Sequence, residues 1–503
     1  MRGHGTILSL FSIAALAGSC NSDTKLALSI SNIPVDTESV NISIKIDEKS
    51  YDVEPLRFGS TDNNGTSKNA LSGITIPFGF NNKQIDIKTT AISKLGNKCP
   101  TAEWSGSIGA IEPGTYSVSV PLQNIINDDI RNDLFSVATI SATEAWAVGT
   151  SGTVVKWDGC YWRRKDFLAE KPGLAINKIY YHANIGLIAL GNDGTIAKYN
   201  TQSLTWNEID LSSIIGTGEN LQSIIWTGIT YLEGSTGDFL ILGSAVNKLI
   251  TNGEAQCFAA RLSPAGTTYQ ATRISSPFCP TYPKFITSPP VCNQFGSTNS
   301  ASSCNFVASS AYSFPPDRIV ISGTAYIPSQ NTAFIVLDNK LQQIPSAPNP
   351  MWVPSISSAN TYGTPGTVWG TSINDFWLGS NHFFRIMNST TSPSAPTNKP
   401  IATETELYKN NTDQMKVISI IGFGAKDFWT IGFPNSRFSQ VNHFIDKPGL
   451  ALDYSNIGIL KYNTGIDNYP ITHMSAVSNN DIWFVGYGGI RIHYNGTNFQ
   501  VYR

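Results

Sequence analysis

Charged residues are scarce in this chain of 503 residues. Only 14% of them are Asp, Glu, Lys or Arg, and the formal net charge is −2, whereas about 25% of the residues of an average globular protein are charged. Proteins that bind nucleic acid or anionic lipid by charge carry clusters of Lys and Arg. This nearly neutral composition, without a polybasic stretch, therefore points away from both kinds of ligand.

The usual motifs of catalytic and metal sites are also missing. The sequence has no G-x-S-x-G elbow, no Walker loop and no G-x-G-x-x-G after an expected strand. Its six histidines lack the H-x-x-x-H or H-x-H spacing that would bring two of them to one metal ion. Phe384-Arg385-Ile386 resembles three letters of the sialidase F-R-I-P motif, but Met387 replaces the proline. We therefore expect no cofactor and no metal, and the sequence favours a binding protein over an enzyme.

No apolar run in the sequence is long enough to cross a bilayer as a helix, which takes about 20 residues. Ile7 to Leu16 form an apolar stretch of about ten residues after Arg2. This pattern is typical of a secretory signal peptide, which we assign to residues 1–19. The alternative is cleavage after Ala15-Leu16-Ala17, a small-x-small site that would leave Cys20 as a free thiol.

The end of this segment, Ala17-Gly18-Ser19-Cys20, resembles the lipobox of bacterial lipoproteins. The resemblance implies that Cys20 becomes the mature N-terminus and carries a diacylglyceryl group, which anchors the chain to a membrane. By the same resemblance, Asn21 in place of Asp after the cysteine implies delivery to the outer membrane. The expected location is therefore the bacterial cell envelope.

Six further cysteines form an even set in a compartment where disulfides persist. Four of them are spaced by 22, 13 and 12 residues, unlike the tight C-x-x-C pairs of zinc sites. We expect these four to form disulfides with one of three connectivities. Cys99 and Cys160 lie outside this group, and we expect a bridge between two domains, the alternatives being two free thiols or pairing with the group. The group consists of Cys257, Cys279, Cys292 and Cys304.

Residues 20–125 predict an antiparallel β-sandwich. Apolar and polar residues alternate in several runs that turn residues separate, which is the pattern of strands with one buried face. About one hundred residues of such strands fit an immunoglobulin-like sandwich, which we interpret as a spacer. The alternating positions are Leu26, Leu28 and Ile30; Val40, Ile42, Ile44 and Ile46; Ile85 and Ile87; and Tyr116, Val118 and Val120.

Residues 126–503 contain seven copies of a short repeat that ends in glycine. Each copy lies among further apolar runs, so a unit of roughly 50 residues holds four expected strands, as in a β-propeller blade. One interval of 80 residues contains a segment rich in Pro, Ser and Cys at about 274–305, which we expect to be a disulfide-stapled loop. The sequence thus predicts an all-β chain with a seven-bladed propeller of four-stranded blades. The glycines are Gly149, Gly191, Gly243, Gly323, Gly379, Gly432 and Gly486.

Two segments resemble known propeller repeats. Gly186 to Trp206 is similar to a kelch-type blade, and Asp481 to Tyr494 is similar to the D-x-W-x-V-G repeats of bacterial propeller lipoproteins. Most copies lack the paired glycines of true kelch repeats, so the resemblance implies the fold and says little about function. Asp158-Gly159 and Asn495-Gly496 predict type I′ hairpin turns.

Six copies carry an acidic residue just before the second strand. A ring of carboxylates could bind cations or act in acid and base catalysis, but the recurrence favours a structural role in which each acid bonds its own backbone two residues on. The following tryptophans, Trp146, Trp377, Trp429 and Trp483, are interpreted as packing between blades, the alternative being a platform for sugars. The acids are Glu144, Asp238, Asp317, Asp375, Asp427 and Asp481.

These observations predict an exported, lipid-anchored protein whose propeller binds a protein or a glycan without catalysis. Two other functions are compatible with the same residues. One is a scaffold in envelope assembly, and the other is a hydrolase or lyase that acts on polysaccharide. The sequence does not specify the ligand.

Overall fold

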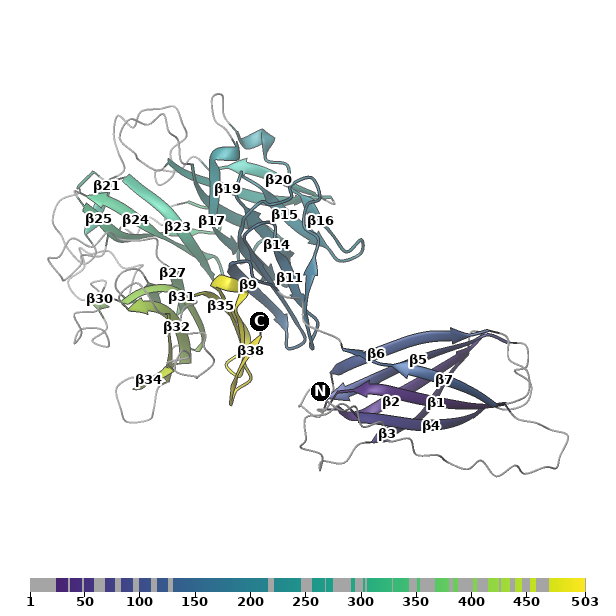
Figure 1. The fold of residues 1–503 in the computed structure, drawn as a ribbon. Helices are drawn as coiled ribbons and strands as arrows, with labels where there is room; N and C mark the ends of the chain where they lie inside the picture. The colour runs from purple at the N-terminus through teal and green to yellow at the C-terminus, as the bar shows by residue number, and fades with distance from the viewer. Residues whose placement is uncertain are drawn as a thin grey trace, which may run out of the picture. The chain divides into compact units, whose positions relative to one another are not determined.

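The computed structural model is almost entirely β-sheet (Figure 1). The chain divides into two compact units, Met1–Ile126 and Asn127–Arg503. Among the described residues, no helix is both long and apolar enough to cross a membrane. In the described ranges, the helical elements are the 3-10 turns η1 (Ser212–Ile214), η2 (Leu221–Ser223) and η5 (Tyr487–Gly489). The structure describes residues 24–34, 37–47, 49–57, 68–76, 83–93, 99–109, 115–124, 130–215, 221–245, 256–266, 268–274, 291–294, 302–303, 305–327, 329–342, 351–352, 367–379, 383–387, 401–404, 415–424, 427–434, 439–445, 453–457 and 470–502.

The first unit consists of two sheets that share one apolar core. One sheet has the strand order β4-β1-β7, in which β1 is antiparallel to β4 and parallel to β7. The other sheet has the order β3-β2-β5-β6-β8, and its pairings are antiparallel. The strands are β1 (Thr24–Ile33), β2 (Thr37–Ile46), β3 (Lys49–Arg57), β4 (Lys68–Ile76), β5 (Ile85–Ser93), β6 (Pro100–Ile108), β7 (Thr115–Pro121) and β8 (Gln123–Asn124).

The alternation predicted for these strands is confirmed. Leu26, Leu28 and Ile30 on β1 are at most 1% exposed, and the apolar residues of β2 face the same core at every second position. Tyr116 and Val118 on β7 are half-buried and pack against it. Removing this apolar surface from water, at about 25 cal/mol per Å², is the main favourable contribution to folding of the unit.

The second unit is a β-propeller, as predicted. In the described part, its strands form seven sheets, each built from one continuous stretch of chain. The innermost strands β9, β13, β17, β23, β27, β31 and β35 contact one another in this order around a ring. The strands are β9 (Leu134–Ser141), β10 (Glu144–Gly149), β11 (Val154–Trp157), β12 (Trp162–Lys165), β13 (Ile176–His182), β14 (Gly186–Gly191), β15 (Ile196–Asn200), β16 (Thr205–Glu208), β17 (Ile224–Tyr231), β18 (Phe239–Ala245), β19 (Gln256–Ala265), β20 (Thr268–Arg273), β21 (Val291–Gln294), β22 (Ser302–Ser303), β23 (Asn305–Phe314), β24 (Arg318–Ile327), β25 (Ser329–Asp338), β26 (Met351–Trp352), β27 (Thr367–Ser372), β28 (Asp375–Gly379), β29 (Phe383–Met387), β30 (Ile401–Glu404), β31 (Met415–Gly424), β32 (Asp427–Pro434), β33 (Gln440–Ile445), β34 (Asp453–Ile457), β35 (Ile471–Ser478), β36 (Asp481–Gly486), β37 (Arg491–Tyr494) and β38 (Phe499–Tyr502).

The last sheet closes the ring against the first, and β35 lies beside β9 (Figure 1). The backbone amide of Val137 on β9 donates a hydrogen bond of 3.3 Å to Nδ1 of His473 on β35. Away from the ring axis, the Trp483 ring packs against Trp157 and Trp162, with ring centroids 5.0 and 4.9 Å apart. In the described part, the two sheets share no strand, so side chains hold this closure together.

Close approach of the backbone just before the innermost strand explains the repeat glycine of the first and last sheets. In six of the seven sheets, the innermost strand has a β-bulge next to the residue paired with this glycine. A Cβ atom on Gly149 would lie 1.8 Å from the carbonyl oxygen of Asp133, and one on Gly486 would lie 2.2 Å from that of Pro470. A side chain at either position would collide with backbone, which cannot swing aside.

The fourth sheet corrects two expectations. It has six strands in the order β22-β21-β26-β25-β24-β23, where the sequence predicted four. Strands β21 and β22 lie inside the insertion at about 274–305, which the sequence predicted to be a loop. Val291–Gln294 shows no alternation of its own, and it becomes a strand by pairing with β22 and, in parallel, with the distant β26.

The turns between third and fourth strands are longer than predicted. Trp157 pairs with Trp162, so four residues connect these strands where a type I′ turn has two. The Asp158 carboxylate accepts hydrogen bonds from the amides two and three residues on, at 3.0 and 2.8 Å. Gly159 has a φ of +94° but Asp158 does not have a positive φ, whereas a type I′ turn needs positive φ at both central residues. Asn495 makes the same two bonds, so a side-chain-stabilised turn replaces the predicted one.

Candidate functional site: the central channel

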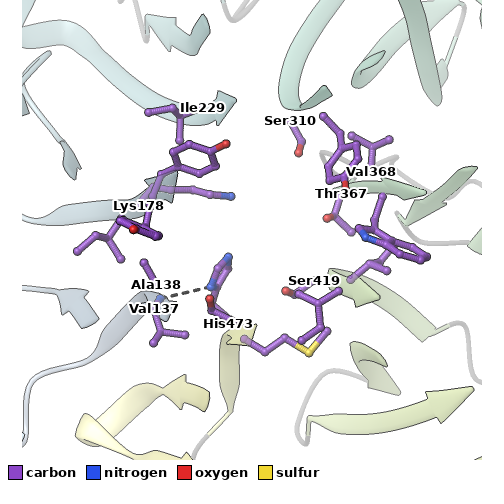
Figure 2. A pocket seen from close by; sticks show the side chains of 18 of the residues that line it. Val137, Ala138, Lys178, Ile229, Ser310, Thr367, Val368, Ser419 and His473 are labelled. Carbon is purple, nitrogen blue, oxygen red and sulfur yellow. Dashed lines mark hydrogen bonds between the residues drawn. The ribbon is translucent and has the colours of Figure 1, made fainter. Parts of the chain in front are cut away.

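The innermost strands enclose a cavity along the axis of the ring. Its volume is about 710 Å³, and all seven innermost strands contribute lining residues. Figure 2 shows labelled side chains from each of these strands around the open space. Volumes of roughly 300–1,000 Å³ are typical of sites that bind small molecules. The channel therefore has room for a ligand.

Strand pairing arranges the lining side chains in layers. In each sheet, the residue before the repeat glycine pairs with one residue of the innermost strand, so these seven partners are equivalent positions around the ring. We call this set the polar layer, because five of its members have a hydroxyl, amine or imidazole. The polar layer consists of Ser136, Lys178, Gly228, Ser310, Val368, Ser419 and His473.

The next position along each innermost strand is apolar in every sheet. Successive side chains of a strand point to opposite faces, and these seven are at most 8% exposed. They fill the space between neighbouring sheets, whereas the polar layer contributes Lys178, Ser310, Ser419 and His473 to the lining of the channel. The apolar positions are Val137, Ile179, Ile229, Ala311, Trp369, Ile420 and Met474.

Lys178 and His473 project into the channel from β13 and β35 (Figure 2). Burial lowers the pKa of Lys178, and no carboxylate of the described residues forms an ion pair with it. Burial, together with the charge of Lys178, lowers the pKa of His473 to about 3. His473 is therefore neutral at pH 7. Its Nδ1 accepts the Val137 amide, so the proton of the neutral ring is on Nε2.

Aromatic and acidic groups gather toward the opposite end of β13. Burial raises the pKa of Tyr180 to about 12 and also raises the pKa of Tyr312, so both hydroxyls stay protonated near neutral pH. The Tyr180 hydroxyl accepts the backbone amide of Tyr231 at 3.1 Å. His182 stacks on Tyr231 with ring centroids 3.9 Å apart, and its Nε2 lies 3.8 Å from Oε1 of Glu233. Burial lowers the pKa of His182.

The six acids predicted from the repeat do not line the channel. Asp317 pairs with the adjacent Arg318 at 2.7 Å, and each of the others pairs with a cationic or imidazole side chain on the third strand of its sheet. Among the described hydrogen bonds, none joins one of these carboxylates to the backbone two residues on. Except for Asp317, each carboxylate extends across the sheet to its partner instead. The pairs are Glu144 with Lys156 (2.8 Å), Asp238 with Arg261, Asp375 with Arg385 (2.7 Å), Asp427 with His443 (2.8 Å) and Asp481 with His493 (2.7 Å).

The tryptophans of the repeat are part of the same contacts. Trp146, Trp377, Trp429 and Trp483 are at most 2% exposed, so none presents a face that a sugar could cover. In their sheets, the partner of the acid lies over the tryptophan ring; the His493 ring, for example, stacks on Trp483 at 4.4 Å. Arg385, part of the sialidase-like run, belongs to this set. These residues therefore stabilise the sheets.

The cysteines are only partly within the described residues. Cys99, just before β6, and Cys160, in the turn between β11 and β12, are both disulfide-bonded, so neither is a free thiol. Cys257 and Cys292 belong to β19 and β21, and their side chains lie outside the described part, as do Cys20, Cys279 and Cys304 altogether. Within the described ranges, no three His, Cys, Asp or Glu side chains are placed to hold one metal ion.

Sequence reasoning missed the channel residues Lys178 and His473. Neither belongs to a motif, and they come from sheets far apart in the chain. The signal that could have found them is alignment of the repeats on their glycines. Thirteen residues separate Lys178 from Gly191 and His473 from Gly486. The three serines of the polar layer, Ser136, Ser310 and Ser419, lie at the same distance before the repeat glycines of their own sheets.

The chain matches no protein-family model and no curated protein. Its fold is similar to solved β-propellers at low identity. YCF48 from Cyanidioschyzon merolae is 12% identical, with 73% of this chain and 97% of that chain covered and a TM-score of 0.42. The WD40 β-propeller domain of Doa1 is 13% identical (72% and 92% covered, TM-score 0.39), and that of Cps50 (Swd1) from Myceliophteria thermophila is 8% identical (72% and 96%, TM-score 0.43). The TM-scores are low, so the assignment of this chain as a β-propeller rests on its own sheets and on the ring that they form.

Proposed function

We propose that this chain is an exported lipoprotein whose seven-bladed propeller is a non-catalytic binding module for a protein or a glycan. The lipobox-like residues that end at Cys20 support the lipid anchor, and Asn21 supports the outer membrane as its destination. The two-sheet unit, which we assign as an immunoglobulin-like sandwich, would then separate the propeller from the lipid. Cys99 and Cys160 would bridge the two units.

The observation that carries the binding role is the channel of about 710 Å³ with its polar layer. A cavity does not stabilise a protein core, because the side chains that line an empty space lose van der Waals contacts on that side. Hydroxyl, amine and imidazole groups at equivalent positions of the ring give this cavity directional hydrogen-bonding groups. Such a combination of room and a few polar groups is what ligand sites share.

Blocking the channel tests this role. The mature protein would be screened against immobilised neutral and acidic polysaccharides and against a displayed library of random peptides. We expect saturable binding that Ser310→Trp abolishes, because the indole would occupy the channel. Ser203→Trp is the matched control, because Ser203 is exposed in the turn between β15 and β16. Thermal melts would verify that both variants fold.

Three results would speak against the proposal. One is the absence of saturable binding in both screens, and another is binding that survives Ser310→Trp. The third is turnover of a polysaccharide or an activated ester that Ser310→Trp removes, which would favour the hydrolase or lyase. Protease shaving of intact cells separates a surface-facing binding module, which would be cut, from an inward-facing scaffold, which would be spared.

A further inference from the structure

Lys178 is the one lysine or arginine among the described residues that line the channel, and burial disfavours its charged form. No Asp or Glu is found among these described lining residues. Glu233, which is not among the lining residues, has its Oε1 3.8 Å from Nε2 of His182. An ammonium that burial has stripped of water and that has no counter-charge raises the free energy of the folded protein. A bound anion would remove this penalty.

His473 adds a polar group to the site but no charge. Because its ring is neutral at pH 7, it adds a hydrogen-bond donor, Nε2–H, without a second positive charge. The serines Ser310 and Ser419 occupy the equivalent positions on β23 and β31 and line the same channel (Figure 2). Their hydroxyls can donate to other oxygen atoms of the same ligand. One ammonium beside one neutral imidazole donor matches a singly charged anion, such as a carboxylate, better than a doubly charged phosphate.

The size of the channel indicates what carries this anion. About 710 Å³ is far more than a carboxylate group alone would fill. The same lining includes the aromatic side chains of Tyr180 and Tyr312 and the hydroxyl of Thr367. Aromatic surface together with hydroxyl partners suits the apolar face and the hydroxyls of a sugar ring.

We infer that the channel binds a monocarboxylate of the size of a sugar acid, with its carboxylate held by Lys178 and His473. This inference rests on the proposed binding function and specifies its ligand class. The carboxylate would pair with the Lys178 ammonium and accept a hydrogen bond from the imidazole Nε2–H, while the hydroxyls of Ser310 and Ser419 would meet other polar groups of the ligand. The uncharged part of the ligand would extend along the channel toward Tyr312.

Calorimetric titration of the mature protein with D-glucuronate tests the site. The neutral methyl ester of glucuronate and D-glucose are the comparison ligands. We expect glucuronate to bind at least about tenfold more tightly than its ester, since a hydrogen bond to a charged group contributes about 1.5–3 kcal/mol. Acetate, which has the carboxylate without the sugar, should bind more weakly than glucuronate if the rest of the channel contributes.

Neutralising the lysine should remove this preference. In Lys178→Met, glucuronate and its ester should bind within about twofold of each other. Lys198→Met is the matched control, because Lys198 donates to the Tyr269 hydroxyl at 3.0 Å and does not line the channel. It should keep the wild-type preference. If Lys178→Met does not fold, Lys178→Gln serves the same comparison.

Equal binding of glucuronate and its ester, a preference that survives Lys178→Met, or no binding of glucuronate would each overturn the carboxylate site. None of these results tests the proposed function. That function is tested separately, by the binding of polysaccharides and peptides to the wild type and to Ser310→Trp. Conversely, binding in that screen that ignores Ser310→Trp would overturn the proposed function itself.

Discussion

The proposed lipid anchor depends on one residue, Cys20. Replacing it by Ala removes the thiol that would accept the diacylglyceryl group. Stable anchoring takes at least two acyl chains, so we expect Cys20→Ala to move the protein from the membrane to the soluble fraction. Fractionation in high salt with immunodetection measures this, and Cys160→Ala, which removes a different cysteine, should stay with the membrane. Sedimentation of Cys20→Ala with membranes in high salt would show that the anchor is wrong.

His473 makes stability depend on pH in a predictable direction. In the unfolded chain it takes up a proton near pH 6.5, whereas in the folded protein it does so only near pH 3. Between these two pH values the unfolded state binds more protons than the folded state. The contribution of His473 to the free energy of unfolding is therefore complete above pH 6.5 and is lost as the pH falls toward 3. We expect the melting temperature of the wild type to drop more between pH 7 and pH 5 than that of His473→Gln.

The other titratable groups along the channel wall are Lys178, Tyr180, Tyr181, His182 and Tyr312. Of these, Lys178 and His182 also have lowered pKa values, and both residues are present in the two proteins, so the comparison isolates His473. Equal drops in melting temperature for the wild type and His473→Gln would contradict the burial of a neutral imidazole at this position.

At this scale, the sequence identifies which residues recur but not what they touch. The acid of each repeat was visible, but its partner lies 10 residues on for Asp375, 16 for Asp427 and 12 for Asp481. These distances vary because the turn between second and third strands varies in length. A pairing set by register across a sheet therefore leaves no fixed spacing in the sequence.

Among the structural elements, the second strand of each propeller sheet contains the repeat glycine, and in the first sheet this position has no room for a side chain. Adding a Cβ to Gly149 would place it 1.8 Å from the Asp133 carbonyl oxygen. We expect Gly149→Ala to lower the free energy of unfolding by about 2–3 kcal/mol, as other overpacked sites do. Urea denaturation measures the loss. Gly424→Ala is the control, because nothing lies within 4 Å of the Cβ it would add.

If Gly149→Ala and Gly424→Ala lose equal stability, the effect is one of glycine flexibility rather than close approach, and the explanation of the repeat glycine is wrong.

The elements that the sequence predicted well are those whose own residues follow a pattern, either alternation of apolar and polar residues or the glycine repeat. Alternation located β1, β2 and β5, and the repeat located the second strand of each sheet. Strands that depend on distant partners were missed, as β21 was. The polar layer was also missed, because a one-residue bulge in most innermost strands changes which side chains face the channel.

For the whole molecule, the disulfides decide whether the two units are tied together. Cys99 and Cys160 belong to different units, and both are disulfide-bonded. A bridge between them would close a loop of about 60 residues, worth roughly 4 kcal/mol in the chain-entropy model. We expect non-reducing peptide mapping to recover the two as one linked pair. Linkage of either to Cys257, Cys279, Cys292 or Cys304 would remove the bridge and leave the units free to pivot.

The closure of the ring has a consequence for how the protein is made. Val137 and His473, which meet at the closure, are 336 residues apart, and Trp157 and Trp162 are covered by Trp483 from the last sheet. A chain that emerges from the ribosome or the export channel N-terminus first must keep this aromatic surface exposed until almost all of it has been delivered. A product that stops early never covers it. Exposed apolar surface of this kind is bound by chaperones and cleaved by proteases. Full-length molecules bury it and truncated ones expose it, so we expect truncated chains to be removed.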